Sequence, residues 1–88
     1  MNNQKKLFKT VADTFNINID LIDINSSSNT LKGWDSLGMI KLITELEQIF
    51  KVKFDILEIG ELQNIKIIKK TLEKKGINFW LIIKYLLD

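Results

Sequence analysis

The sequence predicts a small all-α domain, and three features of the chain point to this fold class. None of the 88 residues is proline, so the composition contains no residue that would break a helix interior. Apolar residues recur at steps of three and four in several segments, which is the spacing of one helical face. With 45% hydrophobic and 27% charged residues, the chain has the composition of one folded globular domain.

The first predicted helix spans residues 4–15, and a long loop follows it. One helical face carries Leu7, Phe8, Val11 and Phe15. Residues 16–34 are rich in Asn, Asp and Ser, so we expect a loop there, pinned to the core by Ile17, Ile19, Ile22 and Ile24. A loop of this length is unusual in so small a domain and is often functional.

The strongest helical pattern runs from Ser36 to Phe50. At roughly 100° per residue, one broad arc of this helix should face the core, and it carries Met39, Leu42, Ile43, Leu46, Ile49 and Phe50. Leu37 and Ile40 fall on the opposite side, among polar residues that include Lys41 and Glu47. We expect both to be exposed as a docking surface. The alternative is a wider core, with the first loop folded across them.

A short third helix is expected after Asp55. Asp55 and Glu58 have the spacing of a capping box, and Ile56, Ile59 and Leu62 follow as its apolar residues. Gly60 weakens the helical pattern.

A fourth helix is expected to begin after Asn64, which can cap it. Its inward face carries Ile65, Ile68 and Leu72. Lys74 and Lys75 suit the negative end of the helix dipole, and Gly76 ends the helix.

The last segment, residues 77–88, is apolar at nearly every position from Phe79 to Leu87 and is too short to span a bilayer. We expect an additional helix that enlarges the core and folds back through Phe79, Trp80, Ile83 and Leu87. A helix that binds a membrane interface or a partner, and self-association, are the alternatives. The domain organisation is thus one domain over residues 1–76 and an apolar extension over residues 77–88.

The composition also excludes several kinds of chemistry. The chain contains no cysteine and no histidine, which removes disulfides, thiolate nucleophiles, cysteine-ligated zinc and the commonest general base. Its carboxylates are scattered, and it has no nucleotide-binding glycine motif, so we expect no catalysis by the chain itself. The net charge of +2 gives little support for nucleic-acid binding. The N-terminus has no apolar signal segment, so we expect a cytoplasmic location.

The segment from Gly33 to Gly38 joins the long loop to the strongest helix and places Ser36 at the helix N-terminus. Free backbone N–H groups and the positive end of the helix dipole would favour a phosphodiester attached there. The alternative is that Asp35 or Ser36 simply caps the helix, which is the commoner role for such residues.

Asp35, Ser36 and Leu37 match the attachment motif of the acyl carrier protein family, and the pattern from Gly38 through Phe50 resembles the second helix of that family. The resemblance extends in spacing over roughly residues 4–75. It implies a small four-helix bundle of acyl-carrier type, with 4′-phosphopantetheine attached covalently to Ser36. A phosphopantetheinyl transferase would transfer this arm from coenzyme A.

The resemblance also implies what the protein does. The thiol of the arm would carry acyl or aminoacyl groups from a loading ligase or synthase to a condensing or transferring enzyme. The residues expected to contact these partners are Asp35, Leu37, Ile40, Lys41 and Glu47.

The chain departs from the family in its charges. Many fatty-acid carriers present acidic residues along this helix, whereas Gly38 and Lys41 follow the serine here, and only Glu47 keeps acidic character on the exposed face. With its positive net charge, the chain looks like a specialised carrier that serves dedicated partners. In having Trp34 and Gly38 at these positions, the chain resembles free-standing carriers of aminoacyl or polyketide-type intermediates.

Two other classes of function stay open. The first is an interaction module without a cofactor, which would use Leu37, Ile40 and the C-terminal segment as contacts. The second is a helix-turn-helix nucleic-acid binder, which is less favoured because the strongest helix exposes Leu37, Ile40 and Glu47 around its lysine.

Overall fold

The computed structural model describes residues 2–79, and all of its regular structure there is helical. The elements are α1 (Asn3–Phe15), the short 3₁₀ helix η1 (Ile19–Leu21), α2 (Ser36–Phe50), α3 (Ile56–Glu61) and α4 (Ile65–Lys74). No β-strand occurs within this range. The predicted all-α fold class with four helices is therefore confirmed, and η1 within the first loop was not expected.

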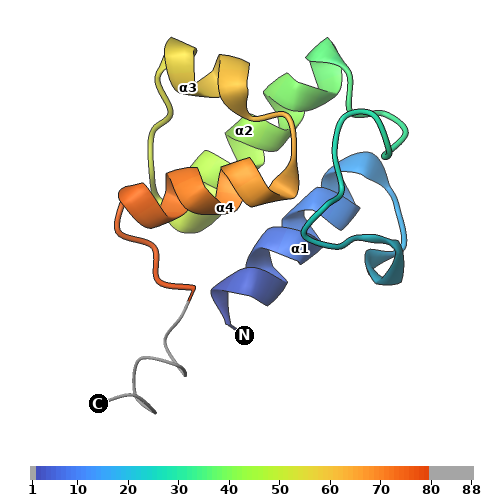
Figure 1. Cartoon of the computed structure of the whole chain (residues 1–88), viewed down its shortest axis with the longest axis horizontal. Coiled ribbons are helices and arrows are strands. Elements are labelled where there is room, and N and C mark those ends of the chain that lie inside the picture. The colour runs from blue at the N-terminus through green and yellow to red at the C-terminus, as the bar shows by residue number, and fades with distance from the viewer. Residues whose placement is uncertain (1, 80–88) are drawn as a thin grey trace.

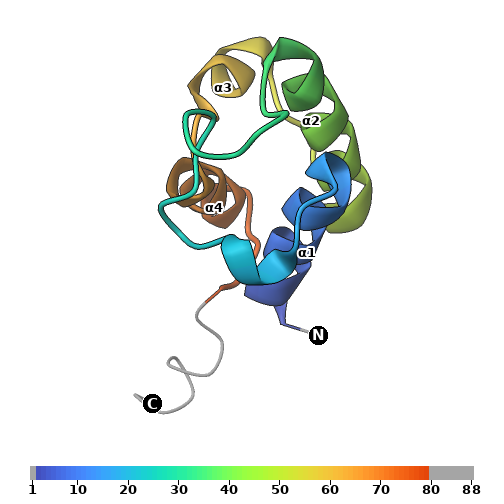
Figure 2. The same cartoon turned by 90° about the vertical axis from the view of Figure 1, so that its right-hand side faces the viewer.

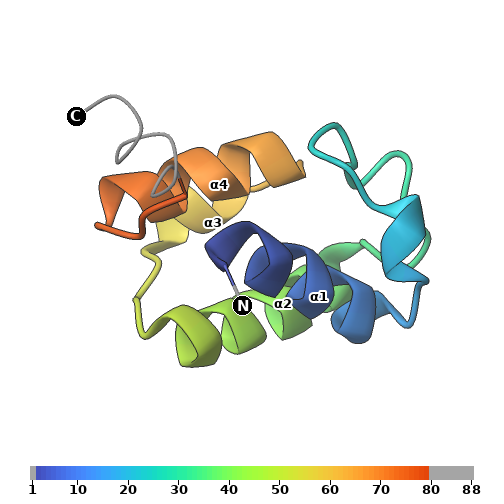
Figure 3. The same cartoon turned by 90° about the horizontal axis from the view of Figure 1, so that it is seen from below.

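The helices are arranged around one core. α1 and α2 lie side by side, and α3 and α4 lie on one side of this pair, as Figure 1 and the view from below in Figure 3 show. The first loop passes from the end of α1 over the side of the molecule to the start of α2 (Figure 2).

Each of the four α-helices begins with an amide or carboxylate cap. The side chain of the cap residue accepts a hydrogen bond from the backbone N–H three residues later, and the caps are Asn2, Asp35, Asp55 and Asn64. At α3 the predicted capping box is complete, because Glu58 also accepts from the N–H of Asp55 at 3.0 Å. Local sequence signals therefore define where these helices start.

The core is built mainly from α1, α2 and α4, together with Leu62 directly after α3. Its fully buried side chains are Leu7, Val11, Leu42, Leu46, Leu62, Ile65, Ile68 and Leu72. Most residues expected to face inward on α1, α2 and α4 do so. Ile49 is the exception on α2: it is 39% exposed, because it lies at the outer seam between α1 and α2 rather than beneath α4.

The first loop adds side chains to this core. Ile22, Leu31 and Trp34 are buried, whereas Ile19 is 40% exposed within η1. Ile17 and Ile24 are half-buried against the core. The loop is thus pinned partly by the predicted isoleucines and partly by a leucine and a tryptophan that the pattern did not single out.

Backbone hydrogen bonds tie the loop to the junction between α3 and α4. The N–H of Ser28 donates to the carbonyl of Gln63 at 3.0 Å, and the N–H of Ile65 donates to the carbonyl of Ser26 at 2.9 Å. These bonds hold the loop over the end of α3 and position it beside the start of α2.

The chain leaves α4 through Gly76, which has a left-handed φ of 96°, and residues 77–79 are not helical. Phe79 returns to the core and packs on Phe50, with ring centroids 6.3 Å apart. The rest of the expected C-terminal helix, with Trp80, Ile83 and Leu87, lies outside the described residues.

Candidate functional site

The N-terminus of α2 is capped by Asp35. The Asp35 backbone is extended, and its Oδ1 accepts a hydrogen bond from the N–H of Gly38 at 2.9 Å. The Asp35 carbonyl then accepts from the N–H of Met39 at 2.8 Å, which begins the helical ladder. Of the two cap residues that the sequence left open, Asp35 and Ser36, the structure therefore assigns the cap to Asp35.

Ser36 is the first residue of α2, and its side chain is exposed. Its hydroxyl makes no hydrogen bond to the described part of the chain, and the backbone N–H groups of Ser36 and Leu37 have no acceptor there. These N–H groups lie at the positive end of the helix, where about half an elementary charge favours an anion. An exposed hydroxyl, unused by the fold, therefore sits where a phosphate group is stabilised.

Two glycines fix the loop against this end of α2. A Cβ on Gly38 would overlap the carbonyl oxygen of Gly33 and would lie 2.9 Å from Cε1 of Phe15. Gly33 itself has a φ of 92°, which favours glycine. Close contact between the backbone of Gly33 and Gly38 therefore positions Ser36, and sequence reasoning did not predict this contact.

Trp34 lies directly before the cap and is only 4% exposed. Its ring stacks on Phe15 of α1, with centroids 5.5 Å apart and an interplanar angle of 24°. The indole Nε1 is buried and has no hydrogen-bond partner within the described residues. Sequence reasoning noted Trp34 only as part of the motif, because a single aromatic residue in a loop carries no periodicity.

A cleft of about 540 Å³ lies beside Ser36, between the first loop, the start of α2 and the end of α3. It has both polar and apolar walls. Its lining residues are Ser28, Trp34, Asp35, Ser36, Met39, Ile40, Ile59, Gly60 and Gln63.

Leu37 and Ile40 are 63% and 62% exposed, as their positions on the helix predict. The first loop does not cover them. On α3, Ile56 and Leu57 are more exposed still, at 84% and 79%. The sequence pattern assigned Ile56 to the apolar residues of this helix and did not consider Leu57. Neighbouring helices thus present four large apolar side chains to solvent.

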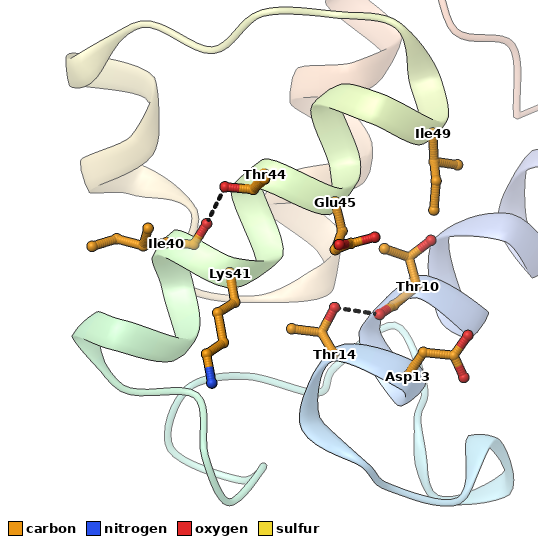
Figure 4. A pocket seen from close by; sticks show the side chains of 8 residues that line it. All are labelled: Thr10, Asp13, Thr14, Ile40, Lys41, Thr44, Glu45 and Ile49. Atoms are coloured by element: carbon orange, nitrogen blue, oxygen red, sulfur yellow. Dashed lines mark hydrogen bonds between the residues drawn. The ribbon is translucent and has the colours of Figure 1, made fainter.

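Lys41 is exposed and lies on the other side of α2, at a groove of about 490 Å³ between α1 and α2. Figure 4 shows Lys41 and Glu45 directed toward α1, while Ile40 points away from it. The groove hydroxyls of Thr14 and Thr44 already donate to carbonyls of their own helices, at 2.7 and 2.9 Å. Ile40 and Lys41 therefore both border this groove, but their side chains point in different directions.

Glu47 is half-buried rather than fully exposed. Its Oε2 accepts a hydrogen bond from the N–H of Phe54 at 3.0 Å and so holds the connection between α2 and α3. The expectation that Glu47 gives the exposed face of α2 an acidic character is therefore met only in part. A helical wheel predicts which side of its own helix a residue occupies. It does not predict whether the following segment of the chain packs against that residue.

The carboxyl of Glu58 lies against both Lys75 and the backbone of Asp55. A 2.8 Å hydrogen bond from Lys75 Nζ, together with the N–H of Asp55, holds the pKa of Glu58 below its ordinary value. Lys75, expected to act at the helix end, instead links α4 to α3.

Within residues 2–79, no cluster of three or more carboxylate, His or Cys side chains could hold a metal ion. None of the helices in that range combines the length and apolar character that crossing a membrane requires. Comparison of the chain with models of protein families, with curated proteins and with solved structures gives no match.

Proposed function

We propose that this chain is an acyl carrier protein, with the four-helix architecture of that class, and that Ser36 carries 4′-phosphopantetheine. The proposal assigns the chain no catalysis of its own. It holds acyl or aminoacyl groups and presents them to a loading ligase or synthase and to a downstream condensing or transferring enzyme.

The observation that carries the proposal is that Asp35, and not Ser36, makes the capping hydrogen bond of α2. A serine that caps its helix has its hydroxyl engaged with the backbone, which is the ordinary structural reason for a serine at this position. Here the Asp35 carboxylate makes that bond, and the exposed Ser36 hydroxyl serves no structural purpose in the described residues. Modification of Ser36 therefore leaves the fold intact.

The surroundings of Ser36 fit a phosphodiester-linked arm. The N–H groups of Ser36 and Leu37 and the dipole of α2 stabilise the negative charge. The adjoining cleft offers both polar and apolar contacts to a chain attached at its edge. The group would supply the thiol that holds the cargo as a thioester, and the polypeptide itself contains no cysteine.

Partner recognition is proposed at the apolar surface next to Ser36. Leu37 and Ile40 follow the serine on α2 and are well exposed, so a partner enzyme that approaches Ser36 can bury them. The nearest exposed charge later on the helix is Lys41, not a carboxylate. We therefore propose partners with apolar rather than strongly basic docking surfaces, in a specialised biosynthetic pathway.

The test is intact-protein mass spectrometry after incubation with coenzyme A and a broad-specificity phosphopantetheinyl transferase. Wild type should gain one phosphopantetheine mass, and Ser36→Ala should gain none. Ser28→Ala is the matched control, because Ser28 lines the same cleft but lies in the loop, and it should be modified like wild type. The free energy of unfolding of Ser36→Ala should also lie within about 0.5 kcal/mol of the wild-type value, because Asp35 provides the cap.

The second candidate is an interaction module without a cofactor, favoured by the exposure of Ile56 and Leu57 in addition to Leu37 and Ile40. It predicts no adduct on any serine with several transferases. It also predicts that Ser36→Ala keeps the binding of a partner, whereas Leu37→Ala with Ile56→Ala loses it.

A further inference from the structure

The indole N–H of Trp34 is a buried donor without an acceptor. Trp34 is 4% exposed, and its Nε1 is the one buried side-chain nitrogen or oxygen in the described residues that lacks a hydrogen-bond partner. Folded proteins pair nearly all such groups, because a buried donor without a partner lowers stability. An orphaned donor therefore indicates a partner that is not part of the described chain.

The indole cannot turn to find a partner of its own. Its ring is stacked on Phe15, and the loop that carries it is fixed by the contact of Gly33 with Gly38. The side chain thus stays in the wall of the cleft that Ser36 also lines. Trp34 and Ser36 therefore line one cleft, while the Trp34 N–H itself is buried and not open to it.

The other polar side chains of this cleft already have partners. Ser28 Oγ donates to Gln63 Oε1 at 3.2 Å, and Gln63 Nε2 donates to the carbonyl of Gly60 at 3.1 Å. Asp35 is engaged by the N–H of Gly38. Besides the Ser36 hydroxyl and the second N–H of the exposed Gln63 amide, the Trp34 N–H is the side-chain donor of this cleft without an acceptor, and of these it is the buried one.

We propose that Trp34 is the residue that holds the arm on Ser36, by donating its indole N–H to an amide carbonyl oxygen of the arm. This inference rests on the proposed function, which supplies the arm and its amide groups. Solvent does not reach Nε1 in the described structure, so the bond forms when the cleft opens slightly. The gain of an acceptor then favours the opened cleft, because a group that binds one state better shifts the population toward it.

The direct test observes the indole proton by NMR of the ¹⁵N-labelled protein, before and after attachment of phosphopantetheine from coenzyme A. The variant Trp80→Phe identifies the Trp34 signal, since the chain has only two tryptophans. We expect the Trp34 indole proton to move downfield on attachment and to exchange more slowly with solvent. An unchanged signal, or one already at the hydrogen-bonded position before attachment, overturns the inference.

A second test uses Trp34→Phe, which keeps a ring for stacking and removes the N–H. Attachment should raise the unfolding temperature of wild type by about 4–8 °C, and this rise should be absent in Trp34→Phe. Equal rises in both proteins overturn the role of Trp34 while leaving the proposed function in place. Intact-protein mass spectrometry separates the question of whether the arm is attached from the question of whether Trp34 holds it. No adduct on either protein overturns the proposed function and this inference with it. The NMR measurement on wild type stands even if Trp34→Phe does not fold.

Discussion

The absence of a side chain at Gly38 determines how closely the first loop approaches α2. In the sequence, Gly38 stands out by its place in the motif two residues after Ser36, which does not predict its contact with the first loop. In the structure it is buried beneath the Gly33 carbonyl and the ring of Phe15. Any Cβ at this position must displace backbone atoms, which adjust much less readily than the end of a flexible side chain.

We therefore predict that Gly38→Ala destabilises the protein by about 1–3 kcal/mol, the range for overpacking a close contact. Gly60→Ala is the matched control, because Gly60 is exposed on α3 and a Cβ there meets nothing within 4 Å. Alanine at position 60 should stabilise the protein by up to about 1 kcal/mol through helix propensity. Urea unfolding measures both, and the same sign for the two variants would contradict this assignment.

Single residues also show where sequence reasoning reaches its limit. The caps at Asp55 and Asn64 could be predicted because each depends on a donor only three residues away, whereas the choice between Asp35 and Ser36 needed the structure. The exposure of Leu37 and Ile40 followed from helical geometry alone. The burial of Trp34 could not be predicted, because it depends on Phe15, which is distant along the chain.

Among the elements, α3 shows how a six-residue helix is held in place when Ile56 and Leu57 are exposed and only Ile59 packs against the core. Its capping box fixes the first turn, and Glu58 of that box is also bound by Lys75 of α4. The Nζ of Lys75 lies 5.3 Å from the ring centroid of Phe54, just before α3. One lysine thus holds both the start of α3 and the segment leading into it.

The ionised carboxyl of Glu58 therefore contributes stability that depends on pH. Its pKa is lowered in the folded state, so this contribution is present above the ordinary carboxyl pKa and is lost as the pH falls through the lowered value. We predict that Glu58→Gln is less stable than wild type at neutral pH, and that the difference shrinks on acidification. Urea unfolding across the acidic range measures this.

Glu61→Gln is the control, because Glu61 belongs to the same helix but is exposed and makes no side-chain hydrogen bond within the described residues. Its stability should follow that of wild type at every pH. A difference between Glu58→Gln and wild type that stays constant with pH would show that the charge of Glu58 does not matter.

The elements themselves were easier to predict than the contacts between them. The bounds of α2 match the predicted segment from Ser36 to Phe50, since apolar spacing and a cap define a helix locally. The positions of Ile49 and Glu47 depended instead on how α1 and the α2–α3 connection pack against α2. Periodicity along one helix contains no information about these neighbours.

At the scale of the whole molecule, the end of the described chain joins three separate parts of the fold. Phe79 packs on Phe50 of α2, and Lys69 of α4 lies over its ring at 5.6 Å. One residue earlier, the carbonyl of Asn78 accepts a hydrogen bond from Nδ2 of Asn3 at 2.8 Å. Residues 77–79 therefore close the core beyond the end of α4.

We predict that Phe79→Ala destabilises the protein by about 1–3 kcal/mol, from lost apolar burial and the lost ring contact with Phe50. Ile56→Ala removes a comparable apolar side chain that is 84% exposed, so it should change stability by less than about 0.5 kcal/mol. Thermal unfolding of both variants measures the contrast. Equal effects would show that residues 77–79 do not support the core.

The hydrogen bond between Asn3 and Asn78 also fixes the beginning of the described chain at one end of the molecule. Figures 1 and 2 show the N-terminal end and the start of α2 at opposite ends of the fold. A sensor surface coupled through a tag before Asn3 would therefore leave the Ser36 face directed into solution. The protein could be immobilised in one orientation, with its modification face open to large soluble enzymes.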